Sequence, residues 1–116
     1  MVFEKLTSIF DSMDLPYYRQ GSFGEDDVYP SSFFTYWKLD NPFGDYGDNK
    51  EHSLITRYAV YFYTNDPSVL ESTLDDFVIR AKEQGFIISG KGVDVPSDDK
   101  AFIGQKINIT FKQMNI

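Results

Sequence analysis

The chain has 116 residues, of which 41% are hydrophobic and 25% charged, a composition typical of a single globular domain, residues 1–116, with one core. Its formal net charge of −7 disfavours specific binding to nucleic acids and docking to anionic membranes, because both are negatively charged. The chain contains no cysteine, which excludes disulfides, thiolate nucleophiles and cysteine-ligated metal centres.

The first predicted helix covers residues 2–13 and ends before Pro16, which cannot continue a helix. Residues 15–19 (LPYYR) then favour a short strand, and a polar, glycine-containing segment follows that is typical of a long loop or a hairpin arm. The apolar residues of the helix recur at spacings of three and four and therefore share one side: Phe3, Leu6, Ile9, Phe10 and Met13.

Two longer strands are predicted in the middle of the chain, over residues 32–39 and 54–64, because both segments are rich in aromatic and β-branched residues. Residues 54–64 are apolar or aromatic on both faces, which favours a strand that is covered on both sides. About a dozen residues rich in Asp and Gly separate the two strands, and loops of this length are commonly functional.

The second predicted helix covers residues 67–84, and both of its ends are well marked. Asp66 is a good N-cap, and Pro67 suits the first helical position. Gly85 suits the left-handed residue that closes a helix, and Phe86 can fold back onto the last turn.

Two further strands are predicted, over residues 86–93 and 105–113. Gly90 and Gly92 indicate a bulge in the first of them, whereas the second alternates regularly between apolar and polar residues. The order α-β-β-β-α-β-β predicts an α+β domain. We expect a mainly antiparallel sheet of four to five strands, with neighbouring strands joined by hairpins and two helices packed on one face.

No sequence motif assigns a catalytic residue, a metal ligand or a cofactor, so we expect a protein that is not an enzyme. The only histidine, His52, lies in a polar loop and is expected to be solvated; a buried pairing with a carboxylate would instead favour a small enzyme. Residues 40–51 have the length of an EF-hand loop but lack its ligand pattern. A looser cation site built from Asp45, Asp48 and Glu51 remains an alternative.

The aromatic residues give the better indication of function, since the chain contains 11 Phe, 8 Tyr and 1 Trp. If Trp37, Val60 and Phe62 point towards the helices, strand alternation places four aromatic residues on the opposite face of the sheet: Phe34, Tyr36, Tyr61 and Tyr63. These residues form either a second buried layer or a patch that binds a protein partner. RNA-binding sheets also display aromatic residues, but they combine them with basic ones, whereas this chain is acidic.

The segments YFYTNDPS and GKGVDVPSDD, together with the capped helix and the closing strands, carry a family resemblance. From Pro16 onward, most of the chain resembles the tail-terminator and tail-to-head joining proteins of long-tailed bacteriophages, including prophage-encoded ones. The shared features are structural rather than catalytic.

The resemblance implies a structural virion component that is assembled in the bacterial cytoplasm. Such a subunit forms a homo-oligomeric ring by a head-to-tail interface and contacts other phage tail or connector proteins. The alternative is a monomeric acidic binding module that acts on a host protein, for example by blocking a basic cleft. The predicted interface residues are four on the sheet and two at a loop tip: Phe34, Tyr36, Tyr61, Tyr63, Phe43 and Tyr46.

Overall fold

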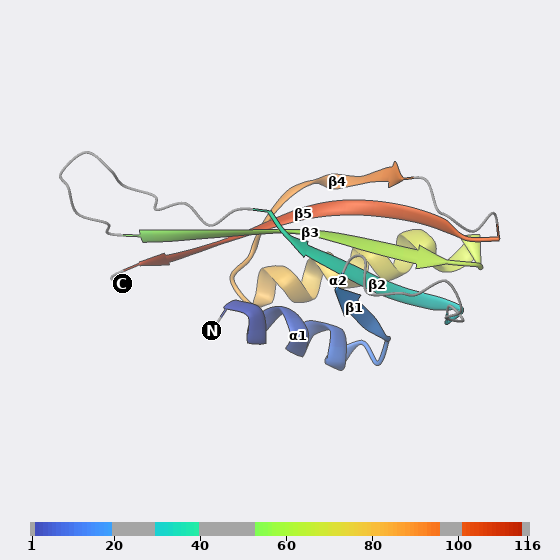
Figure 1. Cartoon of the computed structure of the whole chain (residues 1–116), viewed down its shortest axis with the longest axis horizontal. Helices are drawn as coiled ribbons and strands as arrows, with labels where there is room; N and C mark the ends of the chain where they lie inside the picture. Colours follow the sequence, from blue (N-terminus) through green and yellow to red (C-terminus); the bar gives the residue numbers. More distant parts are fainter. Residues whose placement is uncertain (1, 20–29, 40–52, 96–100, 115–116) are drawn as a thin grey trace.

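The helices and strands occur in the order predicted from the sequence (Figure 1). The computed structural model describes residues 2–19, 30–39, 53–95 and 101–114. These residues form α1 (Val2–Ser12), β1 (Tyr17–Arg19), β2 (Ser32–Lys38), β3 (Ser53–Thr64), the 3-10 turn η1 (Pro67–Val69), α2 (Leu70–Glu83), β4 (Ile87–Val95) and β5 (Ile103–Met114).

The five strands form one mixed sheet in the order β1-β2-β3-β5-β4. Three of the four neighbouring pairs are antiparallel, which confirms the predicted α+β class and the mainly antiparallel sheet. The expectation that hairpins join all neighbouring strands is wrong in two places. β1 runs parallel to β2, and β5 inserts between β3 and β4, so that β4 becomes an edge strand.

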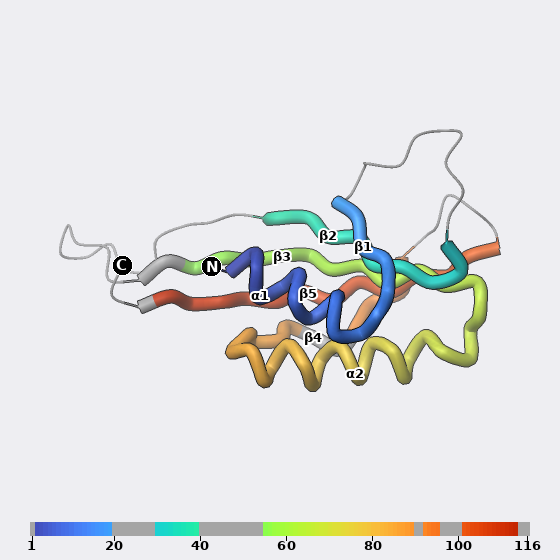
Figure 2. The backbone as a smooth tube through the Cα atoms, turned by 90° about the horizontal axis from the view of Figure 1, so that it is seen from below, coloured from blue at the N-terminus to red at the C-terminus, as the bar shows by residue number. Residues whose placement is uncertain are grey.

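Both helices pack on one face of the sheet, as predicted, and they lie next to each other there (Figure 2). The ring of Phe10 from α1 lies 4.8 Å from that of Phe34 in β2 and 5.8 Å from that of Phe77 in α2, measured between ring centroids. These three rings are fully buried, so a cluster of aromatic residues joins the two helices to the sheet.

The ends of the second helix follow from the residues predicted to cap it. The carboxylate of Asp66 accepts hydrogen bonds from the backbone N–H and the hydroxyl of Ser68, at 3.0 and 2.7 Å, and η1 leads from there into α2. Gly85 has a φ of 96°, and the N–H of Phe86 donates to the carbonyl of Ala81 at 3.0 Å. This is the left-handed helix ending that was expected, and it buries Phe86 against the core.

The predicted bulge of β4 is confirmed and is unusually wide. Ser89 is in register with Asn108 and Val93 with Lys106, so residues 90–92 lie opposite Ile107 alone. Gly92 has a φ of 99°, which glycine adopts without strain. Gly92 of the bulge lines a groove that lies between β4 and α2.

Candidate interaction surface

The sheet has a second face, turned away from the helices, which we call the outer face. Because Phe34, Phe62 and Ile107 are buried beneath the helices, their neighbours along each strand must point to the other side. The register between strands then defines the described residues of the outer face: Tyr18, Phe33, Thr35, Trp37, Ile55, Arg57, Ala59, Tyr61, Tyr63, Gly104, Lys106, Asn108, Thr110, Lys112, Ile87, Ser89, Val93 and Val95.

The placement predicted for Phe34 and Tyr36 on the outer face is wrong. Phe34 is opposite Phe62 in the register of β2 and β3, and Tyr36 is opposite Val60, so both lie on the helical side. Phe34 is fully buried in the core, and Tyr36 contacts Phe3 of α1, with ring centroids 5.6 Å apart. A fully buried ring cannot contact a partner, so Phe34 acts in folding and not in recognition.

Tyr61 and Tyr63 do lie on the outer face, as predicted. Their rings are almost parallel, with an interplanar angle of 4° and centroids 6.3 Å apart. Tyr63 also stacks on Phe33 of β2, at 5.4 Å between centroids. On its other side it lies over Gly104 of β5, where a Cβ would come within 2.6 Å of the ring. The absence of a side chain at Gly104 therefore allows Tyr63 to lie flat across β5.

The other predicted site residues lie outside the described residues. They are the loop-tip interface residues Phe43 and Tyr46, the histidine His52 and the alternative cation ligands Asp45, Asp48 and Glu51.

Sequence reasoning missed three exposed apolar residues of the outer face. Trp37 is 48% exposed, Ile87 is 59% exposed and Val93 is 66% exposed. Trp37 was expected to point towards the helices, because Phe34 had been assigned to the opposite face. Matching Phe34 with Phe62 as a cross-strand pair of core aromatics would have placed Trp37 correctly.

Charge is segregated between the two sides of the sheet. Within the described part of the chain, the strands place three cationic side chains and no acidic one on the outer face: Arg57, Lys106 and Lys112. The ammonium of Lys106 lies 6.0 Å from the centroid of the Tyr61 ring, so basic and aromatic groups are combined there. The net charge of the chain gave no indication of this local combination.

The described acidic residues belong to the helical side. Asp94 of β4 shares that side with Gln105, whose amide donates to its carboxylate at 2.9 Å. The others lie on the helices and on the turns that adjoin them: Glu4, Asp11, Asp14, Asp66, Glu71, Asp75, Asp76 and Glu83. Five described cations share the helical side: Lys5, Arg19, Lys38, Arg80 and Lys82. The acidic groups outnumber them, so among the described residues the helical side has a negative net charge and the outer face a positive one.

Two tyrosines of the helical side have a displaced pKa. Burial raises the pKa of Tyr58 in β3, and the neighbouring Tyr36 hydroxyl adds to the effect. Burial also raises the pKa of Tyr17, and the carboxylate of Asp11 raises it further through its charge and a hydrogen bond. Both hydroxyls consequently stay protonated at neutral pH and cannot serve as bases there.

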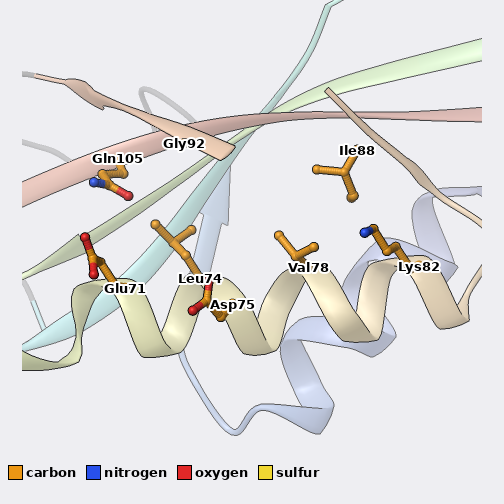
Figure 3. A pocket seen from close by; sticks show the side chains of 8 residues that line it. All are labelled: Glu71, Leu74, Asp75, Val78, Lys82, Ile88, Gly92 and Gln105. Atoms are coloured by element: carbon orange, nitrogen blue, oxygen red, sulfur yellow. The ribbon is translucent and has the colours of Figure 1, made fainter. Parts of the chain in front are cut away.

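A groove of about 640 Å³ lies on the helical side, between α2 and the edge of the sheet (Figure 3). Its floor is apolar and consists of Leu74 and Val78 from α2 and Ile88 from β4. Carboxylates lie at the end near the start of α2, and Lys82 lies near its other end. The remaining lining residues are Glu71, Asp75, Gly92 and Gln105.

The described residues form neither a metal-binding cluster nor a membrane-spanning helix. Among them, no three His, Asp or Glu side chains are grouped so that they could hold a metal ion. No helix formed by these residues is both long and apolar enough to cross a membrane.

No protein-family model matches the sequence, and no curated protein shows significant similarity to it. The arguments about function consequently rest on the fold, the outer face and the groove.

Proposed function

We propose that the chain is a structural subunit that associates with copies of itself head to tail, the outer face of one copy docking on the helical side of the next. By its resemblance to phage tail-terminator and head–tail joining proteins, this assembly is a ring in a virion, made in the bacterial cytoplasm, that contacts other tail or connector proteins.

The segregation of charge is the observation that carries this proposal. A head-to-tail interface joins two different surfaces of the same chain, so those surfaces must complement each other. Lys106 and Lys112 on the outer face and Glu71 and Asp75 on α2 provide opposite charges. A symmetric dimer through the outer face would instead bring cations against cations, which is unfavourable.

Exposed apolar area supports the same conclusion. Trp37, Ile87 and Val93 are all about half exposed or more and lie on one face. Trp37 lies on β2 and the other two lie on β4, so exposed apolar side chains occur on either side of the central strands β3 and β5. Exposed apolar area commonly marks protein–protein contacts. Aromatic residues such as Trp37 provide much of the binding energy of these contacts.

Sedimentation velocity over a wide range of protein concentration tests the proposal. We expect complexes larger than a monomer at low salt, and we expect them to dissociate near 1 M salt, where the screening length is only about 3 Å. Lys106→Glu combined with Lys112→Glu should abolish association. Lys38→Glu is the matched control, because this exposed lysine does not lie on the outer face and its strand, β2, is separated from the groove strand β4 by β3 and β5.

A strict monomer under all these conditions would overturn the proposal. If that monomer bound a basic protein through the acidic residues of α2, the chain would be a monomeric acidic binding module. Charge reversal separates the two functions. At Asp75 it should affect both kinds of complex, whereas at Lys106 it should affect only self-association.

A further inference from the structure

The groove between α2 and β4 combines three chemical features along about three helical turns. Glu71 and Asp75 supply carboxylates near one end, Leu74, Val78 and Ile88 supply an apolar floor, and Lys82 lies near the other end. Glu71 and Lys82 both extend from the helix towards the sheet (Figure 3). The occupant that fits these features is a large, mostly apolar group with a hydrogen-bond donor, accompanied by positive charge.

The outer face of the same chain carries a group of this description. Trp37 is 48% exposed, and it has a large apolar ring and one ring N–H donor. It lies opposite Ala59 in β3, and the small side chain of Ala59 leaves room for a partner to contact the indole ring. Lys106 is on the same face, opposite Tyr61, which follows Ala59 by two residues in β3.

We infer that Trp37 of one copy inserts into the α2–β4 groove of the next copy, an inference that rests on the head-to-tail association proposed above. The indole ring covers Leu74, Val78 and Ile88, and its N–H donates to a carboxylate of Glu71 or Asp75. Lys106 approaches the same carboxylates, and a groove of about 640 Å³ has room for the ring.

Complementation between two variants gives the sharpest test. Trp37→Ala removes the inserting group, and Val78→Lys fills the groove, so each variant alone should stay monomeric at concentrations where the wild type associates. Mixed together, the two should form a one-to-one heterodimer and nothing larger, because one intact contact remains per pair. Trp37→Ala should weaken self-association by about thirtyfold or more, as expected for a central aromatic residue of an interface.

Two further variants make this result interpretable. Asp75→Lys changes an exposed residue that lines the groove, and it replaces Val78→Lys in the test if Val78→Lys does not fold. Ile79→Lys is the control, because Ile79 follows Val78 in α2 but is 57% exposed and does not line the groove. It should associate as the wild type does.

The fluorescence of Trp37, the only tryptophan of the chain, provides an independent measurement. Its emission should shift to shorter wavelength, and its quenching by acrylamide should fall, as the wild type associates. If the protein associates while the indole stays accessible, or if Trp37→Ala associates as the wild type does, the inference is wrong but head-to-tail association stands. If the wild type does not associate at all, the proposed function itself fails.

Discussion

Phe34 lies opposite Phe62 in the antiparallel register of β2 and β3, and their ring centroids are 4.9 Å apart. This pair decides which side of β2 faces the helices, because a strand shifted by one residue exchanges its two faces. It places Phe34 and Tyr36 in contact with α1 and directs Trp37 to the outer face. The separation between the side of the sheet that packs against the helices and the outer face begins with this contact.

Phe34 and Trp37 should consequently respond in opposite ways to truncation. We expect Phe34→Ala to lower the free energy of unfolding by about 3–5 kcal/mol, because it leaves a cavity among Phe10, Phe62 and Phe77. Trp37→Ala should lower it by less than about 1 kcal/mol, because the ring is half exposed. Urea unfolding followed by circular dichroism measures both, and equal losses would contradict the assigned register.

Gly104 should not tolerate a side chain while Tyr63 is present. A Cβ at this position would lie within 2.6 Å of the Tyr63 ring, so we expect Gly104→Ala to cost about 1–3 kcal/mol of stability. In a Tyr63→Thr background the same substitution should cost less, because only the contact with the Val95 side chain, at 3.1 Å, remains tight. A double-mutant cycle measured by urea unfolding tests this coupling, and additive effects would show that the ring does not occupy the space above Gly104.

The Asp66 cap of η1, the turn that leads into α2, should make stability depend on acidic pH. The hydroxyl and the backbone N–H of Ser68 both donate to Asp66 and lower its pKa from the ordinary value of 3.8. The stabilisation is therefore complete above about pH 3.8, the unfolded-state value, and disappears as the pH falls through the lower folded-state pKa.

Thermal melts of Asp66→Asn and Asp66→Ala between neutral pH and pH 2 measure this contribution. Asn caps helices as well as Asp does but does not titrate, so its variant should match the wild type at neutral pH and lose less stability in acid. Asp66→Ala should melt at a lower temperature already at neutral pH. If the wild type and the Asn variant had identical pH profiles, the cap would have no role in acid unfolding.

Asn108 offers a stabilising substitution. Its side-chain oxygen is buried without a hydrogen-bond partner, and Asn is a poor strand former. Asn108→Val removes the unpaired polar atom, and we expect a gain of about 1 kcal/mol in the free energy of unfolding. Thr110→Val, two residues farther on the same face of β5, is the control and should give a smaller gain. Equal gains would indicate a general effect of strand propensity.

The helices, the strands and their order could be predicted because each depends on local signals. Asp66 and Gly85 mark the ends of the second helix by their own backbone preferences, and Gly90 and Gly92 mark the bulge of β4. The parallel pairing of β1 with β2 depends on contacts between distant residues, so hairpin rules did not predict it.

The interaction surface was harder to predict, because residues 33–37 place aromatic side chains on both faces of β2. Alternation alone cannot decide which set is buried, and only the cross-strand partner Phe62 does so. The positive charge of the outer face could not be predicted from the net charge of the chain. Net charge sums over the whole chain, whereas Lys106 and Lys112 are separated from the acidic helices by the sheet itself.

The irregular course of β4 also limits how copies of the chain can accumulate. Only the stretches Ile87–Ser89 and Val93–Val95 keep register with β5, and the backbone turns away at Gly92 between them. A strand of another chain could pair with at most three successive residues of this edge strand before the bulge interrupts the backbone hydrogen-bonding groups. The break in register therefore protects this edge of the sheet from pairing with a strand of another chain.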